Sequence, residues 1–391
     1  MPRATPSTQP APRTAKGRTL ILGGGFAGSY VARGLGRGGA TVVNPANFML
    51  YTPLLPEAAA GSVEARHVTV PLRTMCPHAD LLLGSAVALD PERRVVEVES
   101  EAGRFALAYD NLVIALGAVT RLPDIPGLRE HALDLKDLPD AVRLRNQVLR
   151  QLELADADPA SAERRLTFVI AGAGFAGVEA IAELEELVAS ALRRHPRLEG
   201  VRPRWILVDS GDRILGQTPD GLARFAARTL SKRGIEILTG TKLAAVDAGG
   251  ATLSDGRRIE SETVVWTAGI TPNPLVEQLG LPCDHRGRVL VDETLAVRGL
   301  PGVWALGDCA AGEHERRAHQ RLPSVSSATS RGNSAAAVQS ATTRMRRDAN
   351  GSWIRWYPRA IAQPSSPRTC SPPTTAMPCR LPSVAICPRV R

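Results

Sequence analysis

Two glycine-rich segments carry the strongest chemical signal in the sequence. The first reads GGGFAG over residues 23–28, and the second reads GAGFAG over residues 172–177, 149 residues further along the chain. Glycines at this spacing allow a tight turn, a close approach of the backbone to a pyrophosphate, and tight packing of a helix on a strand. The free N–H groups and the dipole at the helix N-terminus then favour an anion. The segments therefore predict two dinucleotide sites.

The presence of two copies bears on the chemistry. A single segment could be a glycine-rich turn that binds nothing. Two copies, each led by a strand and followed by a helix, favour two bound dinucleotides. The physical use of that arrangement is hydride transfer from a nicotinamide to a flavin, in which the cofactors carry the redox chemistry and the protein supplies geometry and electrostatics. We therefore expect an oxidoreductase that needs no side chain as a nucleophile.

The residue that ends the second strand of each unit helps to assign the ligands. In the second unit it is Asp209, whose carboxylate could accept hydrogen bonds from a ribose 2′-hydroxyl and would repel a 2′-phosphate, which favours NADH over NADPH. The alternative is an ordinary loop carboxylate. In the first unit it is Asn44, an uncharged acceptor that could still bind a ribose. The ligand of the first unit is therefore less clearly indicated.

Four other residues have structural interpretations beside functional ones. Asp308 follows the apolar residues 303–306 and could either present a carboxylate to a ligand or end a strand in a plain turn. Asp110, Glu179 and Cys309 could be a turn residue, a first-turn helix acid and a buried thiol.

Metal and disulfide chemistry are disfavoured. His314 and His319 with Cys309 are the candidate metal ligands, but no matching acid cluster accompanies them, so we expect no metal. The six cysteines form no Cys-x-x-Cys pair, which indicates neither a disulfide framework nor a thiol redox pair.

The elements that must position these residues follow from hydrophobic periodicity. Each glycine segment lies in a β-turn-α-β unit: the first has strands at 18–22 and 40–43 around a helix at 29–35, and the second has strands at 166–171 and 205–208 around a helix that ends near 194. Between the units, strands are expected at 94–98 and 104–109 and a helix at 140–155. Short strands follow over 235–265, with a hairpin turn at 255–256.

Composition changes near the C-terminus. The net charge of +9 suggests a nucleic-acid or acidic-membrane partner, but 13 arginines and only three acids lie after Gly312, which leaves 35 basic and 36 acidic residues before it. This segment lacks periodicity and is rich in Pro, Ser and Thr, so we expect little folded structure in it. We expect no nucleic-acid binding, because helical patterning and interleaved aromatic residues are missing. No apolar run is long enough to span a membrane.

Further motifs make the chain resemble the type II NADH dehydrogenases, in the pyridine-nucleotide-disulfide oxidoreductase superfamily, over roughly residues 18–311. Beyond the glycine segments, the resemblance is carried by FMLYTPLLPEA at 48–58, LK at 135–136, LRN at 144–146, YDNLVIALG at 109–117, VVWTAG at 264–269 and GVWALGD at 302–308.

The resemblance implies an α/β fold with two Rossmann-like domains, the NAD domain inserted in the FAD domain. The implied segments are an FAD-binding part at 18–128, a bridging helix at 129–160, an NAD-binding domain at 161–270 and a second FAD-binding part at 271–312. Composition adds a disordered leader at 1–17, which has no apolar segment, and an aberrant low-order tail at 313–391. The residues expected to bind FAD are Gly23, Gly25, Phe26, Ala27, Gly28, Asn44, Pro53, Leu54, Ala115, Gly117 and Asp308. Those expected to bind NADH are Gly172, Gly174, Phe175, Ala176, Gly177, Glu179, Asp209, Ala268 and Gly269.

The resemblance also implies a reaction: NADH reduces the flavin, and the flavin reduces a quinone at the cytoplasmic side of the cell membrane, as part of a respiratory chain without proton pumping. Glu179 matches the family's glutamate near the contact between nicotinamide and flavin, and is the one candidate catalytic residue. The Cys-x4-Cys pair of the superfamily's disulfide branch is missing, since the first segment holds only Cys76. A dithiol mechanism is therefore not expected.

The chain departs from the family after the Gly-Asp motif, where a Pro-Pro-Thr-Ala-Gln segment at the quinone site and amphipathic membrane helices are expected. Reading residues 322–330 one nucleotide forward with GC-rich codons can give Cys-Pro-Pro-Ser-Ala-Gln-Gln-Arg, which resembles the missing segment. We hypothesise a reading-frame change between about residues 312 and 322, which the nucleotide sequence tests. Uncovered apolar surface would then cause poor solubility or weak flavin retention.

Two other functions remain open. One is a soluble NAD(P)H-dependent flavoprotein reductase of another acceptor, which the choice of acceptor would distinguish. The other is a non-catalytic nucleotide-binding protein or relic, which NADH-dependent bleaching of a flavin would exclude. Our first interpretation is an NADH:quinone oxidoreductase whose C-terminal part is altered.

Overall fold

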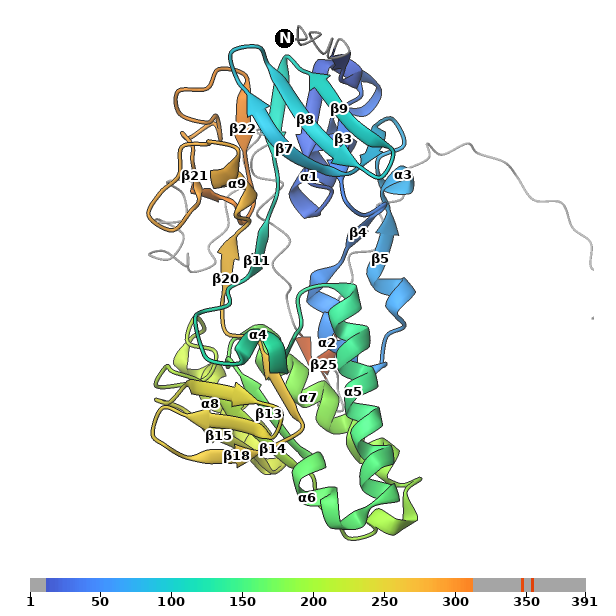
Figure 1. The fold of residues 1–391 in the computed structure, drawn as a ribbon, viewed down its shortest axis with the longest axis vertical. Coiled ribbons are helices and arrows are strands. Elements are labelled where there is room, and N and C mark those ends of the chain that lie inside the picture. The colour runs from blue at the N-terminus through green and yellow to red at the C-terminus, as the bar shows by residue number, and fades with distance from the viewer. Residues whose placement is uncertain (1–11, 312–345, 348–352, 355–391) are drawn as a thin grey trace, which may run out of the picture. The chain divides into compact units, whose positions relative to one another are not determined.

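The computed structural model describes residues 12–311, 346–347 and 353–354, and the chain divides into two units, Met1–Leu322 and Pro323–Arg391. In the second unit, the described residues form an antiparallel pair of strands, β24 (Arg346–Arg347) and β25 (Trp353–Ile354). The rest of the segment expected to have little order, including His314 and His319, lies outside the described residues. All further elements belong to the first unit (Figure 1).

One five-stranded parallel sheet contains the first glycine segment. Its order is β22-β10-β2-β3-β6, from β22 (Val303–Ala305), β10 (Asn111–Ile114), β2 (Thr19–Leu22), β3 (Thr41–Asn44) and β6 (Asp80–Leu83). Helix α1 (Phe26–Gly34) connects β2 to β3, which confirms the first β-turn-α-β unit. Apolar β2 is buried along its whole length because it lies at the centre of this sheet. Strand β22 joins β10 from far along the chain.

A second five-stranded parallel sheet contains the second glycine segment. Its order is β12-β19-β13-β14-β15, from β12 (Ala132–Asp134), β19 (Thr263–Trp266), β13 (Thr167–Ala171), β14 (Arg204–Val208) and β15 (Ile235–Leu238). Helix α7 (Phe175–Leu192) connects β13 to β14, and α8 (Asp220–Lys232) connects β14 to β15. The second β-turn-α-β unit is therefore also confirmed. The described fold is α/β, with two parallel sheets.

Two smaller sheets are mainly antiparallel. One has the order β1-β9-β8-β7, from β1 (Arg13–Thr14), β9 (Gly103–Ala108), β8 (Val95–Ser100) and β7 (Ser85–Asp90). The other joins β16 (Leu243–Asp247), β17 (Gly250–Leu253) and β18 (Arg258–Glu260). The strands expected at 94–98 and 104–109 and the hairpin at 255–256 are confirmed. The disordered leader is wrong for residues 13–17, because β1 pairs with β9 and Ala15 is buried behind it.

The helix expected at 129–160 is shorter. It is α5 (Leu138–Ala157), whose N-terminus is fixed by a capping box between Asp137 and Asp140. The residues before it form α4 (Leu128–His131) and then β12, which pairs with β19 in the second sheet. The expectation of one helix is therefore wrong for residues 129–137, where α4 and β12 precede α5, and for residues 158–160, because α5 ends at Ala157 and a 3-10 helix follows at Pro159–Ser161.

Short segments connect these parts. Strands β11 (Ala118–Thr120) and β20 (Ile270–Pro272) form an antiparallel ribbon between the two parallel sheets (Figure 1). Next to this ribbon, the Trp266 indole donates to the Arg121 carbonyl at 2.8 Å. Within residues 12–311, the remaining strands are β4 (Phe48–Leu50), β5 (Thr69–Pro71), β21 (Val289–Leu290) and β23 (Ala310–Ala311). The remaining α-helices of this range are α2 (Leu55–Ala60), α3 (Leu72–Met75), α6 (Ala162–Arg165) and α9 (Leu275–Gln278). Short 3-10 helices lie at Lys16–Arg18, Gly36–Gly38, Thr52–Leu54, Ala65–Val68, Pro159–Ser161 and Pro196–Leu198.

Helix α2 crosses the boundary that the sequence suggests. It lies within residues 18–128, between strands of the first sheet, yet it packs on α5 and α7 beside the second sheet (Figure 1). Leu54, Leu55, Ala58 and Ala59 are buried in the same hydrophobic cluster as the inner faces of α5 and α7. The core under the second sheet is therefore completed by a segment from the first.

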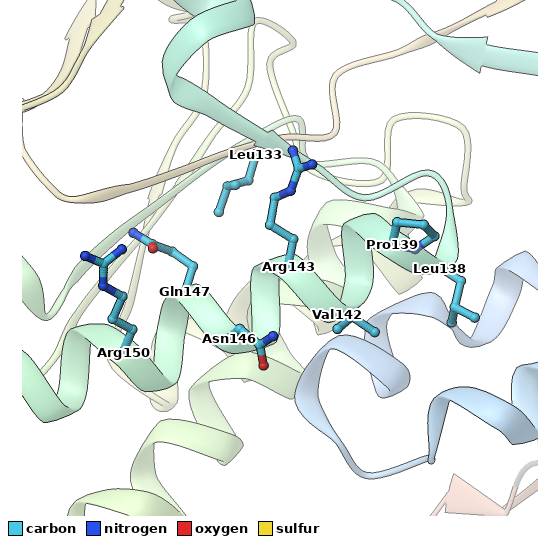
Figure 2. Close-up of a pocket in the computed structure, with 8 residues that line it drawn as sticks. All are labelled: Leu133, Leu138, Pro139, Val142, Arg143, Asn146, Gln147 and Arg150. Carbon is cyan, nitrogen blue, oxygen red and sulfur yellow. The ribbon is translucent and has the colours of Figure 1, made fainter.

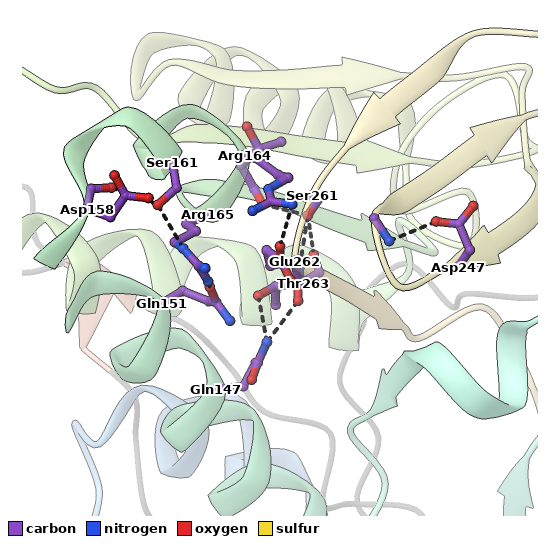
Figure 3. Close-up of polar contacts among 12 residues, drawn as sticks. Gln147, Gln151, Asp158, Ser161, Arg164, Arg165, Asp247, Ser261, Glu262 and Thr263 are labelled. Atoms are coloured by element: carbon purple, nitrogen blue, oxygen red, sulfur yellow. Dashed lines mark hydrogen bonds and ion pairs between the residues drawn. The ribbon is translucent and has the colours of Figure 1, made fainter. Parts of the chain in front are cut away.

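Polar contacts join α5 to the residues before β19, α6 to α5, and the start of β19 to β13 (Figure 3). The Gln147 amide donates to the Glu262 carbonyl at 2.8 Å, and Arg165 donates to the Gln151 side-chain oxygen at 2.9 Å. The buried Ser261 hydroxyl donates to the Thr167 carbonyl at 2.6 Å. These bonds satisfy polar groups that packing removes from water, so they favour one register of the helices on the sheet.

Candidate nucleotide-binding sites

The first glycine loop has no room for side chains at Gly23 and Gly28, the outer glycines of the G-x-G-x-x-G pattern. Gly23 has φ +104°, and a Cβ there would overlap the Ala115 carbonyl oxygen. A Cβ at Gly28 would overlap the Gly23 carbonyl oxygen. At Gly25, by contrast, a Cβ would meet no atom of the described residues within 4 Å. The loop is therefore closed toward the protein and open at its middle glycine, as a close approach to a pyrophosphate requires.

The second loop has the same construction. Gly172 has φ +111°, and a Cβ there would lie 2.6 Å from the Ala268 nitrogen. A Cβ at Gly177 would overlap the Gly172 carbonyl oxygen, whereas one at Gly174 would meet no described atom within 4 Å. In both loops, the first glycine thus packs against a neighbouring strand end, at Ala115 in one case and Ala268 in the other.

The side chains that end the second strands take equivalent places. The Gly24 amide donates to Asn44 Oδ1 at 2.8 Å, and the Ala173 amide donates to Asp209 Oδ2 at 2.5 Å. Asp209 Oδ1 also accepts from the Gly211 amide at 2.7 Å. A carboxylate has about four acceptor positions, so Asp209 retains capacity for a ribose hydroxyl. Asn44 therefore performs the structural part of the acid's role without its charge.

Both helix N-termini can accept an anion. Helix α1 begins at Phe26 and α7 at Phe175, and neither has a side-chain cap or an acid in its first turn. Their first N–H groups are therefore left to a ligand or to solvent. Phe26 and Phe175 are exposed, and the Phe26 ring lies 5.4 Å from that of Tyr51. Ala27 and Ala176 occupy the next position of each helix.

Glu179 differs from its structural interpretation as a first-turn acid. It is the fifth residue of α7, and the first turn holds no acid. The side chain is half-buried on the second turn of the helix. The neighbouring turn contacts the end of α2, where the Ser62 hydroxyl donates to Glu183 Oε2 at 2.8 Å.

The remaining candidates lie in the 3-10 helix Thr52–Leu54 and in the segments that follow β10, β19 and β22. Pro53 is exposed, whereas the side chain of Leu54 is buried in the core with α5 and α7, so the core uses it. Gly117 and Gly269 have φ of +65° and +98°, and a Cβ at either would meet no described atom within 4 Å. Exposed Asp308 follows Gly307, where a Cβ would lie 3.4 Å from that of Ala27 at the start of α1.

Residues with purely structural roles are also distinguishable. Arg18 bonds to Asp110 and lowers the pKa of that exposed carboxyl, which fits a turn residue. Cys309 is fully buried, and burial raises the pKa of its thiol. Cys76 is likewise buried, and its thiol donates to the Ser29 carbonyl. Within residues 12–311, no group of three or more His, Cys, Asp or Glu side chains could hold a metal.

Sequence reasoning missed Thr267. Its hydroxyl lies 3.0 Å from the carbonyl oxygens of both Ala171 and Gly172, so it fastens the strand end to the second loop. The signal was its place directly before Ala268 in the VVWTAG motif. The equivalent residue of the first unit is Ala115, whose amide makes the same backbone bond but whose side chain has no hydroxyl.

A shallow groove of about 760 Å³ runs along the outer face of α5 (Figure 2). It is lined by Leu133, Leu138, Pro139, Val142, Arg143, Asn146, Gln147 and Arg150. None of these residues belongs to either glycine loop.

Of the helices that the structure describes, none is both long and apolar enough to cross a membrane.

Comparison with known proteins gives this geometry a family. The family model for pyridine nucleotide-disulphide oxidoreductases matches residues 17–332. An external alternative NAD(P)H-ubiquinone oxidoreductase of Solanum tuberosum is 33% identical over 330 residues, covering 78% of this chain and 56% of that protein. The type II NADH:quinone oxidoreductase of Mycobacterium tuberculosis is 32% identical over 330 residues, covering 80% of this chain and 70% of that protein.

A solved structure supports the fold. That of the Plasmodium falciparum protein NDH2 in complex with NADH superimposes with a TM-score of 0.69 at 22% identity, covering 75% of this chain and 64% of that one. The chain spans little more than half the length of several curated relatives that it matches. The chain belongs to the pyridine nucleotide-disulphide oxidoreductase family, in its type II NADH:quinone oxidoreductase branch.

Proposed function

We propose that the chain is a flavoprotein oxidoreductase that oxidises NADH and reduces a quinone. The observation that carries this is the pair of equivalent loops, each closed at its outer glycines and open at its middle one, before an uncapped helix N-terminus. The names of the curated relatives, which describe NAD(P)H-ubiquinone and NADH:quinone oxidoreductases, support the choice of donor and acceptor.

FAD belongs in the first site. The α1 N–H groups would hold its pyrophosphate at Gly25, with Gly23, Phe26, Ala27 and Gly28 forming the turn. Asn44 offers an amide to a ribose. Pro53, Ala115, Gly117 and Asp308 complete the proposed set, whereas Leu54 contributes through the core that positions Pro53. When bound, FAD supplies the ability to accept a hydride and to release electrons to a quinone.

NADH belongs in the second site. The α7 N–H groups would hold its pyrophosphate at Gly174, within the turn formed by Gly172, Phe175, Ala176 and Gly177. Asp209 is already oriented by two backbone amides, so it offers a fixed acceptor to the ribose and a negative charge against a 2′-phosphate. Ala268 and Gly269 close the loop, and Glu179 lies one helical turn further in.

Strand pairing supports the proposed domain organisation. We assign 18–128 and 271–312 to FAD, because β22 extends the sheet that begins with β2. Residues 161–270, with β12 from the bridging segment, form the NAD domain. Residues 313–391 lie almost wholly outside the described part of the chain, and the quinone pocket and membrane-surface contact that the branch suggests are assigned to no described residue.

A dithiol plays no part in this proposal. Cys76, Cys283 and Cys309 are free thiols in the described range, and Cys76 is buried against α1 with a raised pKa caused by burial. A buried protonated thiol is a poor nucleophile. The residues of this chain therefore act by binding and orientation.

The test is anaerobic mixing of the flavin-loaded chain with NADH in a stopped-flow spectrophotometer. We expect the flavin absorbance to bleach and to return on addition of a quinone. Recovery with ferricyanide or ferredoxin but with no quinone would instead indicate a reductase of another acceptor. Binding of NADH without any bleaching would contradict the proposal and indicate a binding protein.

A further inference from the structure

The loop after β14, residues 209–219, forms one wall of the second nucleotide site. Its first residue and its middle are bonded to the glycine loop: the Ala173 amide donates to Asp209, and the Leu215 amide donates back to the Ala173 carbonyl at 2.8 Å. Between these two points, the Gly240 amide donates to the Gly211 carbonyl at 2.7 Å. A charged side chain in this loop is therefore held at a set place relative to the glycine loop.

Arg213 is the only basic residue between positions 209 and 219. Its backbone lies near Asp209, since a Cβ at Gly211 would be 3.0 Å from Asp209 Oδ1 and 3.6 Å from the Arg213 carbonyl oxygen. An arginine near the strand-end acid is the residue type that accommodates the 2′-phosphate of NADPH. The composition of the loop alone would thus leave room for either nucleotide.

The guanidinium of Arg213 is already engaged. One terminal nitrogen donates to Asp220 Oδ1 at 2.7 Å, and the other donates to the Gly216 carbonyl at 2.8 Å. Asp220 is the first residue of α8, where a carboxylate is also favoured by the helix dipole. Two donors of the arginine fork are therefore used by Gly216 and by the start of α8, and are unavailable to a phosphate.

We propose that Asp220 is a specificity-determining residue, which holds Arg213 away from the 2′ position of the adenosine ribose and so strengthens the preference for NADH. This rests on the proposed NADH site. Asp209 disfavours the extra phosphate by its charge, and Asp220 removes the cation that could compensate. A substitution at Asp220 can release Arg213, because an ion pair whose acid is 69% exposed is individually weak.

The test compares dissociation constants of NADH and NADPH for the purified full chain by calorimetry. Asp220→Asn frees Arg213, and we expect NADPH binding to tighten roughly fivefold through a charge-assisted bond to phosphate, with NADH binding changed less than about twofold. In the double variant Arg213→Gln/Asp220→Asn the gain disappears.

A matched control separates the position of Arg213 from net charge. Asp212→Asn removes an exposed carboxylate of the same loop and leaves the Arg213–Asp220 pair intact. An equal gain for NADPH in this control, or persistence of the gain in the double variant, overturns the proposal. If the unmodified chain binds NADH and Asp220→Asn gains nothing, only this proposal fails. If the unmodified chain binds neither nucleotide, the proposed NADH site fails as well.

Discussion

The two glycine units share one backbone arrangement and differ in the group that completes it. The amide after the first glycine donates to a side-chain oxygen in both, to Asn44 in the first unit and to Asp209 in the second. An amide oxygen and a carboxylate oxygen both satisfy that N–H group, but only the carboxylate adds charge. The turn therefore needs a hydrogen-bond acceptor at this position but no charge. The negative charge of the carboxylate in the second unit can instead discriminate between ligands.

The helices that follow differ as well. Helix α1 has 9 residues, whereas α7 has 18 and buries its apolar face with α2 and α5. The Thr267 hydroxyl also fastens the second loop, whereas the equivalent residue of the first unit, Ala115, has no hydroxyl. The second unit therefore has more packing support that is independent of a ligand.

The largest expected effect comes from the last glycine of each loop. Gly28→Ala and Gly177→Ala each place a Cβ on the carbonyl of the loop's first glycine. Overpacking of about 2 to 3 kcal/mol would weaken nucleotide binding roughly a hundredfold. Gly28→Ala should lose flavin and keep NADH binding, and Gly177→Ala should do the reverse, as measured by flavin absorbance and NADH titration.

Matched controls exist in neighbouring helices. Gly34→Ala in α1 and Gly221→Ala in α8 meet no described atom within 4 Å. Both should retain both nucleotides. Loss of the same nucleotide from Gly28→Ala and Gly177→Ala would contradict the assignment of one site to each loop.

A smaller effect is expected at the middle glycines. Gly25→Ala and Gly174→Ala fill space that the described protein leaves open, so the free energy of unfolding of the ligand-free chain should change by less than about 1 kcal/mol. Affinity for the corresponding nucleotide should fall about tenfold, because the backbone can no longer approach the pyrophosphate. Chemical denaturation and ligand titration measure the two quantities. Unchanged affinity would show that no ligand approaches the middle glycine.

Exchange of the two acceptors tests the comparison directly. Asp209→Asn keeps an acceptor for the Ala173 amide and removes the charge, so the ratio of NADPH to NADH affinity should rise about tenfold. Asn44→Asp keeps the acceptor for Gly24 and should change the melting temperature of the flavin-free chain little. Selectivity unaltered by Asp209→Asn would mean that the carboxylate serves only the turn.

The smallest effect is expected on stability at low pH, where two exposed ion pairs lose their charge on the acid. Arg258 lowers the pKa of Asp247 to about 2, and Arg18 lowers that of Asp110 from its usual 3.8. Since folding lowers both values, the stability that these pairs contribute is present above about pH 4 and is lost as the pH falls toward 2. Both carboxyls are exposed, so the contribution is small. Asp247→Asn should reduce the drop in melting temperature between pH 6 and pH 3 slightly, and an unchanged drop would show that the pair contributes nothing.

Much of the local structure was predictable. Residues 18–43 and 166–208 revealed their β-turn-α-β units because strand periodicity, glycine spacing and helix periodicity all lie within one short stretch. The hairpin at 255–256 and the strands flanking it were predictable for the same reason. The leader and the bridging helix were wrong in part, because the pairing of β1 with β9 and of β12 with β19 joins residues that no local pattern connects.

The sequence by itself determined where each loop turns and which helix N-terminus it presents, since these depend on φ angles and hydrogen bonds among neighbours in the chain. The oxygens that close the loops, on Asn44 and Asp209, belong to the next strand of each sheet and were placed by folding. Only the tertiary structure decided that α2 completes the core of α5 and α7, that Thr267 fastens the second loop, and that Asp220 holds Arg213. The physical reason is that apolar burial is not directional. Many pairings of apolar segments satisfy it equally, and the whole fold selects among them.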